Sequence, residues 1–253
     1  MRLNRALSLL PPRGRALVVG AVVGSLACSS GARGTAGIER GAKLFESREL
    51  SDSNANRYTC ATCHDAAAGP TTPTAPLQPG SVLAGVTRRP SFWGGMEIDL
   101  LAALDDCRRL FMNDRDPLSR DDPAAQDLYA YLASLEPGDA VPVAFTVPTV
   151  IANVARGDAG RGAPLFARAC GRCHGELHTG RGKLGSNVPA LPEDAVASHE
   201  GYDLDTLRLI FIEKTRHGGF FGYSGVMPPF SVQALSDEQL GDILETLGVL
   251  GAS

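Results

Sequence analysis

Aromatic residues are scarce in this 253-residue chain, at 6% of the composition, so side chains alone can form only small hydrophobic cores. Strand-like alternation of apolar and polar residues is missing around both Cys-x-x-Cys pairs, which argues against a thioredoxin-like redox domain. Neither half adds a second Cys-x-x-Cys or a His-x-x-x-His, so a structural zinc site lacks its four ligands. The apolar run at 16–27 has twelve residues, too few to span a bilayer as a stable helix.

What the chain does contain is the pattern Cys-x-x-Cys-His, twice. In this pattern two thiols reach the two vinyl groups of one porphyrin, and the next imidazole reaches the iron. We therefore expect two covalently bound haem c groups, each with two thioether bonds and a proximal histidine ligand. The residues are Cys60, Cys63 and His64 in the first half, and Cys170, Cys173 and His174 in the second.

The N-terminus has the features of an export signal. Residues 1–15 carry four arginines and no acidic residue, and the short apolar run follows them, so we expect residues 1–27 to be removed. Ser25-Leu26-Ala27-Cys28 resembles the bacterial lipoprotein box, in which the cysteine receives lipid and becomes the new N-terminus. The alternative is cleavage without lipidation. Residues 28–37 are expected to form a flexible tether, which would place a membrane-anchored lipoprotein in the periplasm or cell envelope.

Loss of the leader changes the charge balance. It removes four of the 24 basic residues and none of the 28 acidic ones, which leaves a net charge of −8. An acidic protein of this kind is not expected to bind nucleic acid, whereas its charge suits a basic redox protein as partner.

The length suits two domains of about 100 residues each, and a repeated spacing supports that division. Gly41 and Phe45 precede the first motif, and Gly162 and Phe166 precede the second with the same spacing. We expect domains at 38–136 and 156–250, joined by a proline-containing linker at 137–155. The longer first copy places an inserted surface loop at 47–58.

Hydrophobic periodicity predicts helices and no strands, so the expected fold class is all-α. The helix at 123–135 should cross the one that carries Gly41 and Phe45. Ser236 and Gln239 form a capping box for the last helix. The expected helices are 39–46, 97–111, 123–135, 161–169, 205–215 and 236–247.

Met227 is the candidate distal ligand of the second haem. Its thioether suits a low-spin haem iron, and Pro228 and Pro229 stiffen the loop that holds it between two helices. His217 is its rival, because two imidazoles can also ligate one haem. His178 and His199 are expected in solvated loops.

The order of helix, motif, proline-bearing loop, helix, Met-Pro-Pro loop and final helix resembles a class I c-type cytochrome. The resemblance covers residues 38–250 as a tandem pair with proline-rich loops around the haems. It implies that a proline carbonyl in each loop accepts a hydrogen bond from the proximal histidine. Pro79 and Pro189, each fifteen residues after a motif histidine, are the candidates, unless both loops are simply proline-rich.

The first domain departs from this pattern because no Met-Pro follows its third helix. The segment from Cys107 to Asn113 is similar to one in dihaem thiosulfate dehydrogenases and in the cytochrome subunit of the sulfur-oxidation complex, where a cysteine ligates haem. The resemblance makes Cys107 a candidate ligand, with Met112 as the alternative and Met96 or an open site as the third possibility.

Two functions follow from these resemblances. The first is an exported dihaem cytochrome that transfers single electrons between periplasmic or membrane redox partners. The alternative is an enzyme, similar to a thiosulfate dehydrogenase, that oxidises a sulfur oxyanion at the first haem and passes electrons out through the second. That enzyme would need an anion pocket, for which the sequence offers Arg88, Arg89, Arg108 and Arg109.

Overall fold

The computed structural model describes residues 30–67, 72–135, 142–222 and 225–251, in which helices joined by long loops are the regular secondary structure. Within these ranges the only β-type pairing is an isolated bridge between Phe92 and Glu97. The expected all-α class is confirmed. No helix of the described residues is long and apolar enough to cross a membrane. The export signal and Cys28 lie outside the described residues.

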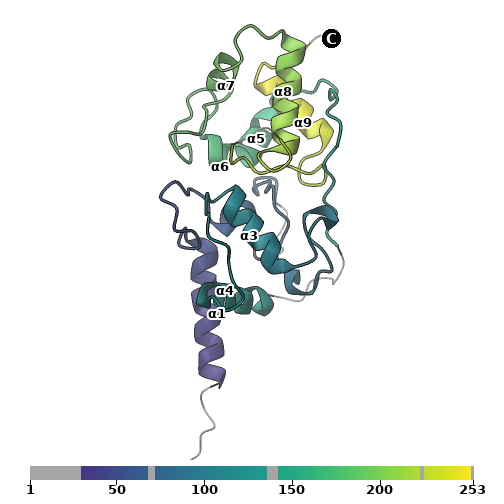
Figure 1. Ribbon diagram of the computed structural model, residues 1–253. Coiled ribbons are helices and arrows are strands. Elements are labelled where there is room, and N and C mark those ends of the chain that lie inside the picture. Colours follow the sequence, from purple (N-terminus) through teal and green to yellow (C-terminus); the bar gives the residue numbers. More distant parts are fainter. Residues whose placement is uncertain (1–29, 68–71, 136–141, 223–224, 252–253) are drawn as a thin grey trace, which may run out of the picture.

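Two helical units are visible in Figure 1, one above the other. We call residues 30–135 the N-terminal unit and residues 156–251 the C-terminal unit, with the segment 142–155 running between them. The N-terminal unit contains α1 (Ser30–Glu46), α2 (Cys60–Cys63), η1 (Val86–Arg88), η2 (Trp93–Gly95), α3 (Leu100–Leu110) and α4 (Pro123–Ser134). The C-terminal unit contains α5 (Ala159–Ala169), α6 (Gly171–His174), α7 (Glu193–Ala197), α8 (Leu204–His217) and α9 (Asp237–Thr246).

Helix α1 starts earlier than the sequence predicts. The expected flexible tether at 28–37 is wrong from Ser30 onward, because those residues are helical. Extending an existing helix fixes one residue per added hydrogen bond, whereas starting a new one is costly. The packed segment from Ile38 to Glu46 therefore supports a longer helix than its own apolar pattern indicates.

The first and last helices of each unit cross at a glycine. A Cβ atom on Gly41 would lie 2.1 Å from the carbonyl oxygen of Asp127 in α4. A Cβ atom on Gly162 would lie 2.0 Å from the carbonyl oxygen of Asp242 in α9. Only glycine allows two helix backbones to approach this closely. The expected crossing of α4 over α1 is confirmed, and α5 and α9 repeat it.

An ion pair accompanies each crossing. Arg40, directly before Gly41, donates to both carboxylate oxygens of Asp127 at 2.6 and 2.8 Å. Arg161, directly before Gly162, donates in the same way to Asp242 at 2.9 and 2.8 Å. The two units therefore share both the glycine contact and the bidentate arginine–aspartate pair.

Each unit has its own core, and the inserted segment 47–58 contributes to one of them. That segment was expected to be a surface loop, but Leu50 and Tyr58 are 5% exposed and belong to the core of the N-terminal unit. The segment is not a surface loop because the burial of these two apolar side chains holds an otherwise polar segment against the core.

The capping box of Ser236 and Gln239 is present as predicted, whereas the short helix α7 was not predicted.

Several contacts join the units, among them a pair of hydrogen bonds and an aromatic stack. In the proline-rich segment after α2, the Leu77 N–H donates to the Arg168 carbonyl at 3.1 Å, and Arg168 Nε donates back to the Ala75 carbonyl at 2.7 Å. The indole of Trp93 stacks on Phe220, with ring centroids 4.4 Å apart and planes 12° from parallel. Both contacts link the surroundings of the first motif to the C-terminal unit.

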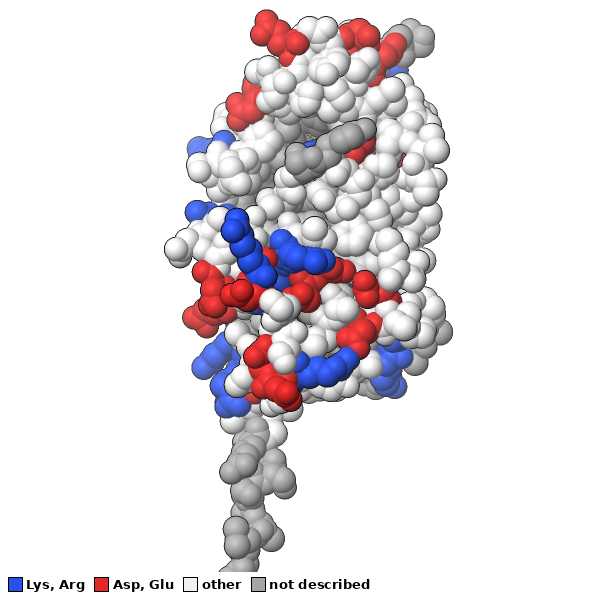
Figure 2. All heavy atoms as spheres, viewed as in Figure 1, with Lys and Arg blue, Asp and Glu red and all other residues white. Residues whose placement is uncertain are grey.

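In the face drawn in Figure 2, acidic and basic side chains intermingle over the N-terminal unit, which lies below the other in this view.

Candidate functional site

A cavity of about 810 Å³ lies mainly in the N-terminal unit, and the first motif forms part of its wall. Its wall also includes residues 142–145 and, from the C-terminal unit, Pro228, Pro229, Ser231, Gln233 and Ala234. Its volume falls within the roughly 300–1,000 Å³ of typical cofactor and ligand sites. Most of the wall is apolar, which suits the faces of a porphyrin. The candidate residues that line it are Cys60, Cys63, His64, Cys107 and Met112.

One ring nitrogen of His64 is engaged by a hydrogen bond to the backbone. Its Nδ1 lies 2.7 Å from the Ser81 carbonyl oxygen, to which it donates, so Nε2 is the ring nitrogen left to bind a metal. Burial lowers the pKa of His64, which keeps the imidazole neutral. The expectation that the Pro79 carbonyl is the acceptor is wrong, because the acceptor is the carbonyl of Ser81, two residues later. The chain passes over the ring at Gly80, where a Cβ atom would lie 2.3 Å from His64 Cε1, and only the carbonyl beyond it meets Nδ1.

Helix α3 presents one face to this cavity. Leu100, Leu104 and Cys107 all line it, as their spacing predicts, and Met112 reaches it from just beyond the end of the helix. Burial raises the pKa of Cys107 well above its ordinary value, and the nearby thiols of the first motif add to the shift. Cys107 is therefore a neutral thiol unless a cation binds it. Met96 is 52% exposed and does not line the cavity.

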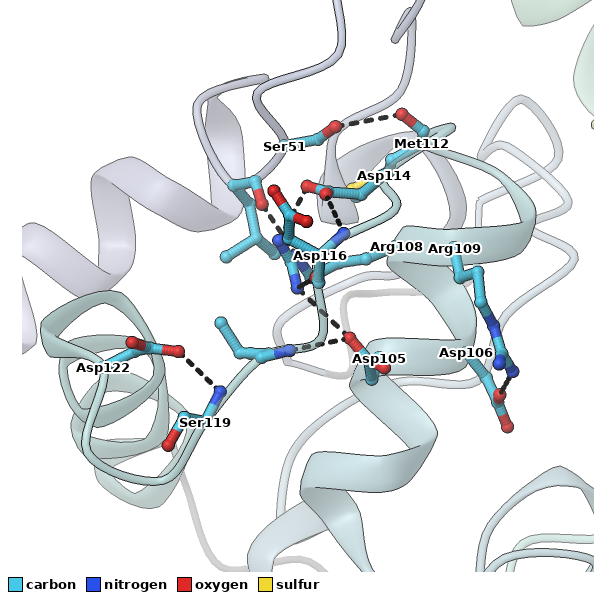
Figure 3. A network of polar contacts seen from close by, with 12 residues as sticks. Ser51, Asp105, Asp106, Arg108, Arg109, Met112, Asp114, Asp116, Ser119 and Asp122 are labelled. Atoms are coloured by element: carbon cyan, nitrogen blue, oxygen red, sulfur yellow. Dashed lines mark hydrogen bonds and ion pairs between the residues drawn. The ribbon is translucent and has the colours of Figure 1, made fainter.

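Two of the four arginines considered for an anion pocket are already paired. Arg108, 7% exposed, donates to Asp114 at 2.6 Å and to Asp105 at 3.2 Å, and its Nε binds the Leu50 carbonyl (Figure 3). Arg109 points away from this network and pairs with Asp106 at 2.5 Å. The expectation that these two side chains form the pocket is wrong, because carboxylates of their own unit occupy them.

Arg89 and Arg108 both line the cavity, and of these two Arg89 has no carboxylate partner among the described residues. Its guanidinium donates to the Ser81 hydroxyl at 3.2 Å and to the carbonyls of Val82 and Ala84, and its buried Nε has no hydrogen-bond partner among the described residues. Burial lowers the pKa of Arg89. Its charge therefore lies beside the segment that orients His64. No sequence motif marks Ser81 or Arg89 for this arrangement.

The second motif shows the predicted proximal geometry. His174 is 9% exposed, and its Nδ1 lies 2.9 Å from the Pro189 carbonyl oxygen. Burial lowers the pKa of this imidazole as well. The expected role of Pro189 is confirmed. Nε2 of His174 is again the nitrogen left for a metal.

Met227 has no strong rival among the histidines of the C-terminal unit. His217 Nε2 lies 2.7 Å from the Pro148 carbonyl oxygen, and its Nδ1 lies 3.4 Å from Glu213. His178 pairs with Glu193 at the surface. Met227 is partly buried and packs against the core that α8 and α9 form. These contacts leave the thioether of Met227 as the better candidate.

The two motifs lie next to each other. Arg172, inside the second motif, donates to the carbonyl of Ala61, inside the first, at 3.2 Å. Burial raises the pKa of Cys63 to about 12, and the thiol of Cys173 contributes to that shift. Cys173 also packs against the core of the N-terminal unit, so α2 and α6 lie side by side at the boundary between the units.

Comparison with known families bears on the second of these sites. Residues 157–245 match the family described as cytochrome c oxidase, cbb3-type, subunit III. The C-terminal unit is a cytochrome c domain. A cytochrome c domain carries covalently bound haem c and transfers electrons, and the second motif lies within the matched residues. No curated protein matches the chain.

Among solved structures, the chain is similar to thiosulfate dehydrogenase (TsdBA) from Marichromatium purpuratum in its as-isolated form. The two share 17% identity with a TM-score of 0.40. The similarity covers 85% of this chain and 46% of the other, so this chain spans about half the length of that protein.

Proposed function

We propose that the protein is an exported dihaem c-type cytochrome, which transfers single electrons between redox partners of the periplasm or cell envelope. The proposal that the N-terminal unit also binds a haem rests on one observation. The first and last helices of the N-terminal unit cross in the same way as those of the cytochrome c domain. Arg40, Gly41 and Asp127 take the places of Arg161, Gly162 and Asp242 at this crossing. A cavity lined by the first Cys-x-x-Cys-His motif supports a haem of its own in this unit.

The residues of each site have defined tasks in this proposal. Cys60 and Cys63, like Cys170 and Cys173, form the thioether bonds that fix a haem. His64 and His174 bind the iron through Nε2, since Nδ1 of each is engaged by a backbone carbonyl. That second contact fixes the ring orientation and raises the basicity of the ligand. The bound haem supplies one-electron chemistry, and the apolar cavity wall keeps water away from it.

The distal ligands would set the direction of transfer. A Cys107 thiolate would stabilise ferric iron and lower the potential of the first site, whereas a Met227 thioether would raise that of the second. Axial ligands tune haem potentials over roughly 0.8 V, so this difference outweighs most other influences. Electrons would enter at the first haem and leave from the second. The contact between Arg172 and Ala61 supports a short path between the sites.

Oxidation of a sulfur oxyanion at the first haem is the second candidate. The observation in its favour is Arg89, a cationic side chain in the cavity wall whose partners there are a hydroxyl and two carbonyls. The paired Arg108 and Arg109 count against it. We place the carrier role first because it needs only what the two sites already provide.

The lipid anchor is a separate proposal, since Cys28 lies outside the described residues. If Cys28 receives lipid, globomycin should leave uncleaved precursor in the membrane. Normal maturation in the presence of the drug would rule the anchor out.

Haem stoichiometry tests the dihaem proposal. Wild-type protein should contain two haems per chain by pyridine haemochromogen assay and by mass, and replacing both Cys60 and Cys63 by Ala should leave one. Cys107→Ala is the matched control, since it removes a cavity thiol without touching the attachment pair. One haem in the wild type would contradict the proposal. Rapid haem reduction by added thiosulfate, with tetrathionate as product, would favour the enzyme instead.

A further inference from the structure

The last turn of α8 contains a wholly buried arginine. Arg216 is 1% exposed, yet its guanidinium carries a full charge that burial makes costly unless hydrogen bonds compensate it. Its Nη1 donates to the carbonyls of Phe230, Ser231 and Leu235 at 3.1, 3.3 and 2.7 Å. Its Nη2 donates to Asp237, the first residue of α9, at 2.6 Å. Four bonds from one side chain thus converge on the segment 230–237.

That segment is the continuation of the loop that carries Met227. Two backbone bonds tie the loop to the same end of α8: Gly219 N–H donates to the Met227 carbonyl at 2.7 Å, and Phe230 N–H donates to the Thr215 carbonyl at 2.9 Å. These bonds hold the loop at both sides of Pro228 and Pro229. The hydrogen bonds of Arg216 then hold the backbone from Phe230 to the start of α9. The loop has little helical or strand structure of its own, so these contacts decide where Met227 points.

The N-terminal unit has a counterpart. Arg108 stands in the last turn of α3, is buried, and binds the Asp114 carboxylate and the Asp116 carbonyl in the segment that follows Met112 (Figure 3). In both units, therefore, a buried arginine at the end of the helix before the distal segment ties that segment down.

We propose that Arg216 is a positioning residue for the distal ligand of the second haem: it holds the segment after Met227 so that the thioether stays directed at the iron. The proposal rests on the proposed ligation by Met227. Removing Arg216 should loosen the loop and allow other ligands to compete for the iron, even where the protein remains folded and keeps its covalently bound haem.

The test compares Arg216→Met with Arg208→Met in the full-length holoprotein. Arg208 is an equally buried arginine of α8, also 1% exposed, but its bonds go to Asn153 and to the carbonyls of Val154, Ala155 and Val249, away from the Met227 loop. Both variants lose a comparable set of bonds. Only Arg216→Met should weaken the sulfur-to-iron charge-transfer band of the oxidised protein and lower the potential of that haem. Cyanide should bind its oxidised form at least about tenfold faster, since losing one charge-assisted bond is worth about that factor.

Equal effects of the two variants would overturn the proposal, because they would show general destabilisation. If Arg216→Met does not fold, Asp237→Ala removes a single partner whose side chain is 62% exposed, and cyanide binding should still accelerate relative to wild type. Arg216→Lys keeps the charge and should restore part of the band. A wild-type spectrum without the band, unchanged in Met227→Leu, would show instead that the proposed ligation is wrong, and the role of Arg216 would fall with it.

Discussion

Cys107 and Met112 present the sharpest question at the scale of single residues. Both line the cavity of the first motif, so position alone does not choose between them. Cys107 continues the face of α3 that Leu100 and Leu104 present to the cavity. Burial and neighbouring thiols raise its pKa, so a thiolate would have to be stabilised by the iron itself. A ferric iron supplies that stabilisation, which makes Cys107 the ligand that we expect.

Replacing Cys107 by Ala should therefore raise the potential of the first haem and change its electron paramagnetic resonance spectrum in the oxidised protein. The physical reason is the loss of an anionic donor, which otherwise favours the ferric state. The signal of the other haem should stay as it is in the wild type. Potentiometric titration with optical detection measures the first effect, and low-temperature resonance spectra measure the second.

Met112→Leu is the matched variant for this experiment. It keeps an apolar side chain of similar volume in a position that is 4% exposed, so it should cost less than about 1.5 kcal/mol in stability. We expect it to leave both haem spectra unchanged. The reverse pattern, with an altered spectrum in Met112→Leu and none in Cys107→Ala, would identify Met112 as the ligand.

At the scale of elements, the paired crossings of α1 with α4 and of α5 with α9 define the architecture. Asp242 shows how charge supports one of them. Its side chain is 3% exposed, and it accepts hydrogen bonds from Arg161 and from the Asp158 N–H. The hydrogen bond from Arg161 is the main reason why the pKa of Asp242 is lowered, while burial opposes the shift.

A lowered pKa makes the stability of this crossing depend on pH. The contribution of the ionised carboxyl is fully present above the ordinary value of 3.8, and it is lost as the pH falls through the lower pKa of the folded state. Asp242→Asn should therefore lower the free energy of unfolding at pH 7 by about 1–2 kcal/mol, discounted because the guanidinium of Arg161 is 60% exposed. The difference between variant and wild type should shrink in strong acid.

Urea unfolding at pH 7 and at a series of lower pH values checks this. Asp127→Asn, in the corresponding place of the other unit, should behave in the same way. Glu200→Gln, on an exposed loop, is the control and should change little at any pH. A deficit in Asp242→Asn that persists undiminished in strong acid would show that packing rather than charge is responsible.

The helices could largely be predicted from the sequence, because their apolar spacing reflects the faces that they bury. Leu128 and Leu132 mark α4, and the capping box at Ser236 marks the start of α9. The attachment residues could be proposed from the sequence because haem chemistry requires a local pattern. Ser81, by contrast, could not be predicted, since its role depends on the path of the backbone past His64. Arg216 was equally hidden, because a buried arginine in a last helical turn resembles an exposed one in sequence.

At the scale of the whole molecule, the question is whether the two units behave as one. The stack of Trp93 on Phe220 lies between them, and Trp93 also contacts Phe111 and Phe145, so a single aromatic cluster spans the boundary. Trp93 is the only tryptophan of the chain. Its fluorescence therefore reports on the N-terminal unit and this boundary, while the charge-transfer band proposed for Met227 reports on the cytochrome c domain.

Phe220→Ala should separate the unfolding of the units. Truncating a fully buried aromatic side chain costs roughly 3–5 kcal/mol, and the half-buried Phe220 should cost less. The stacked pair contributes about 0.5–1.5 kcal/mol of its own, so the contact that makes unfolding cooperative would be lost. In the wild type, tryptophan fluorescence and the Met227 band should change together with denaturant, because the units support each other. In Phe220→Ala, the transition followed by tryptophan fluorescence and the one followed by the Met227 band should occur at different denaturant concentrations. Tyr202→Ala, which removes an aromatic ring that is 59% exposed on the C-terminal unit, is the control and should keep them together. Coincident transitions in Phe220→Ala would mean that the bonds between Arg168 and the segment 75–77 hold the units together without the stack.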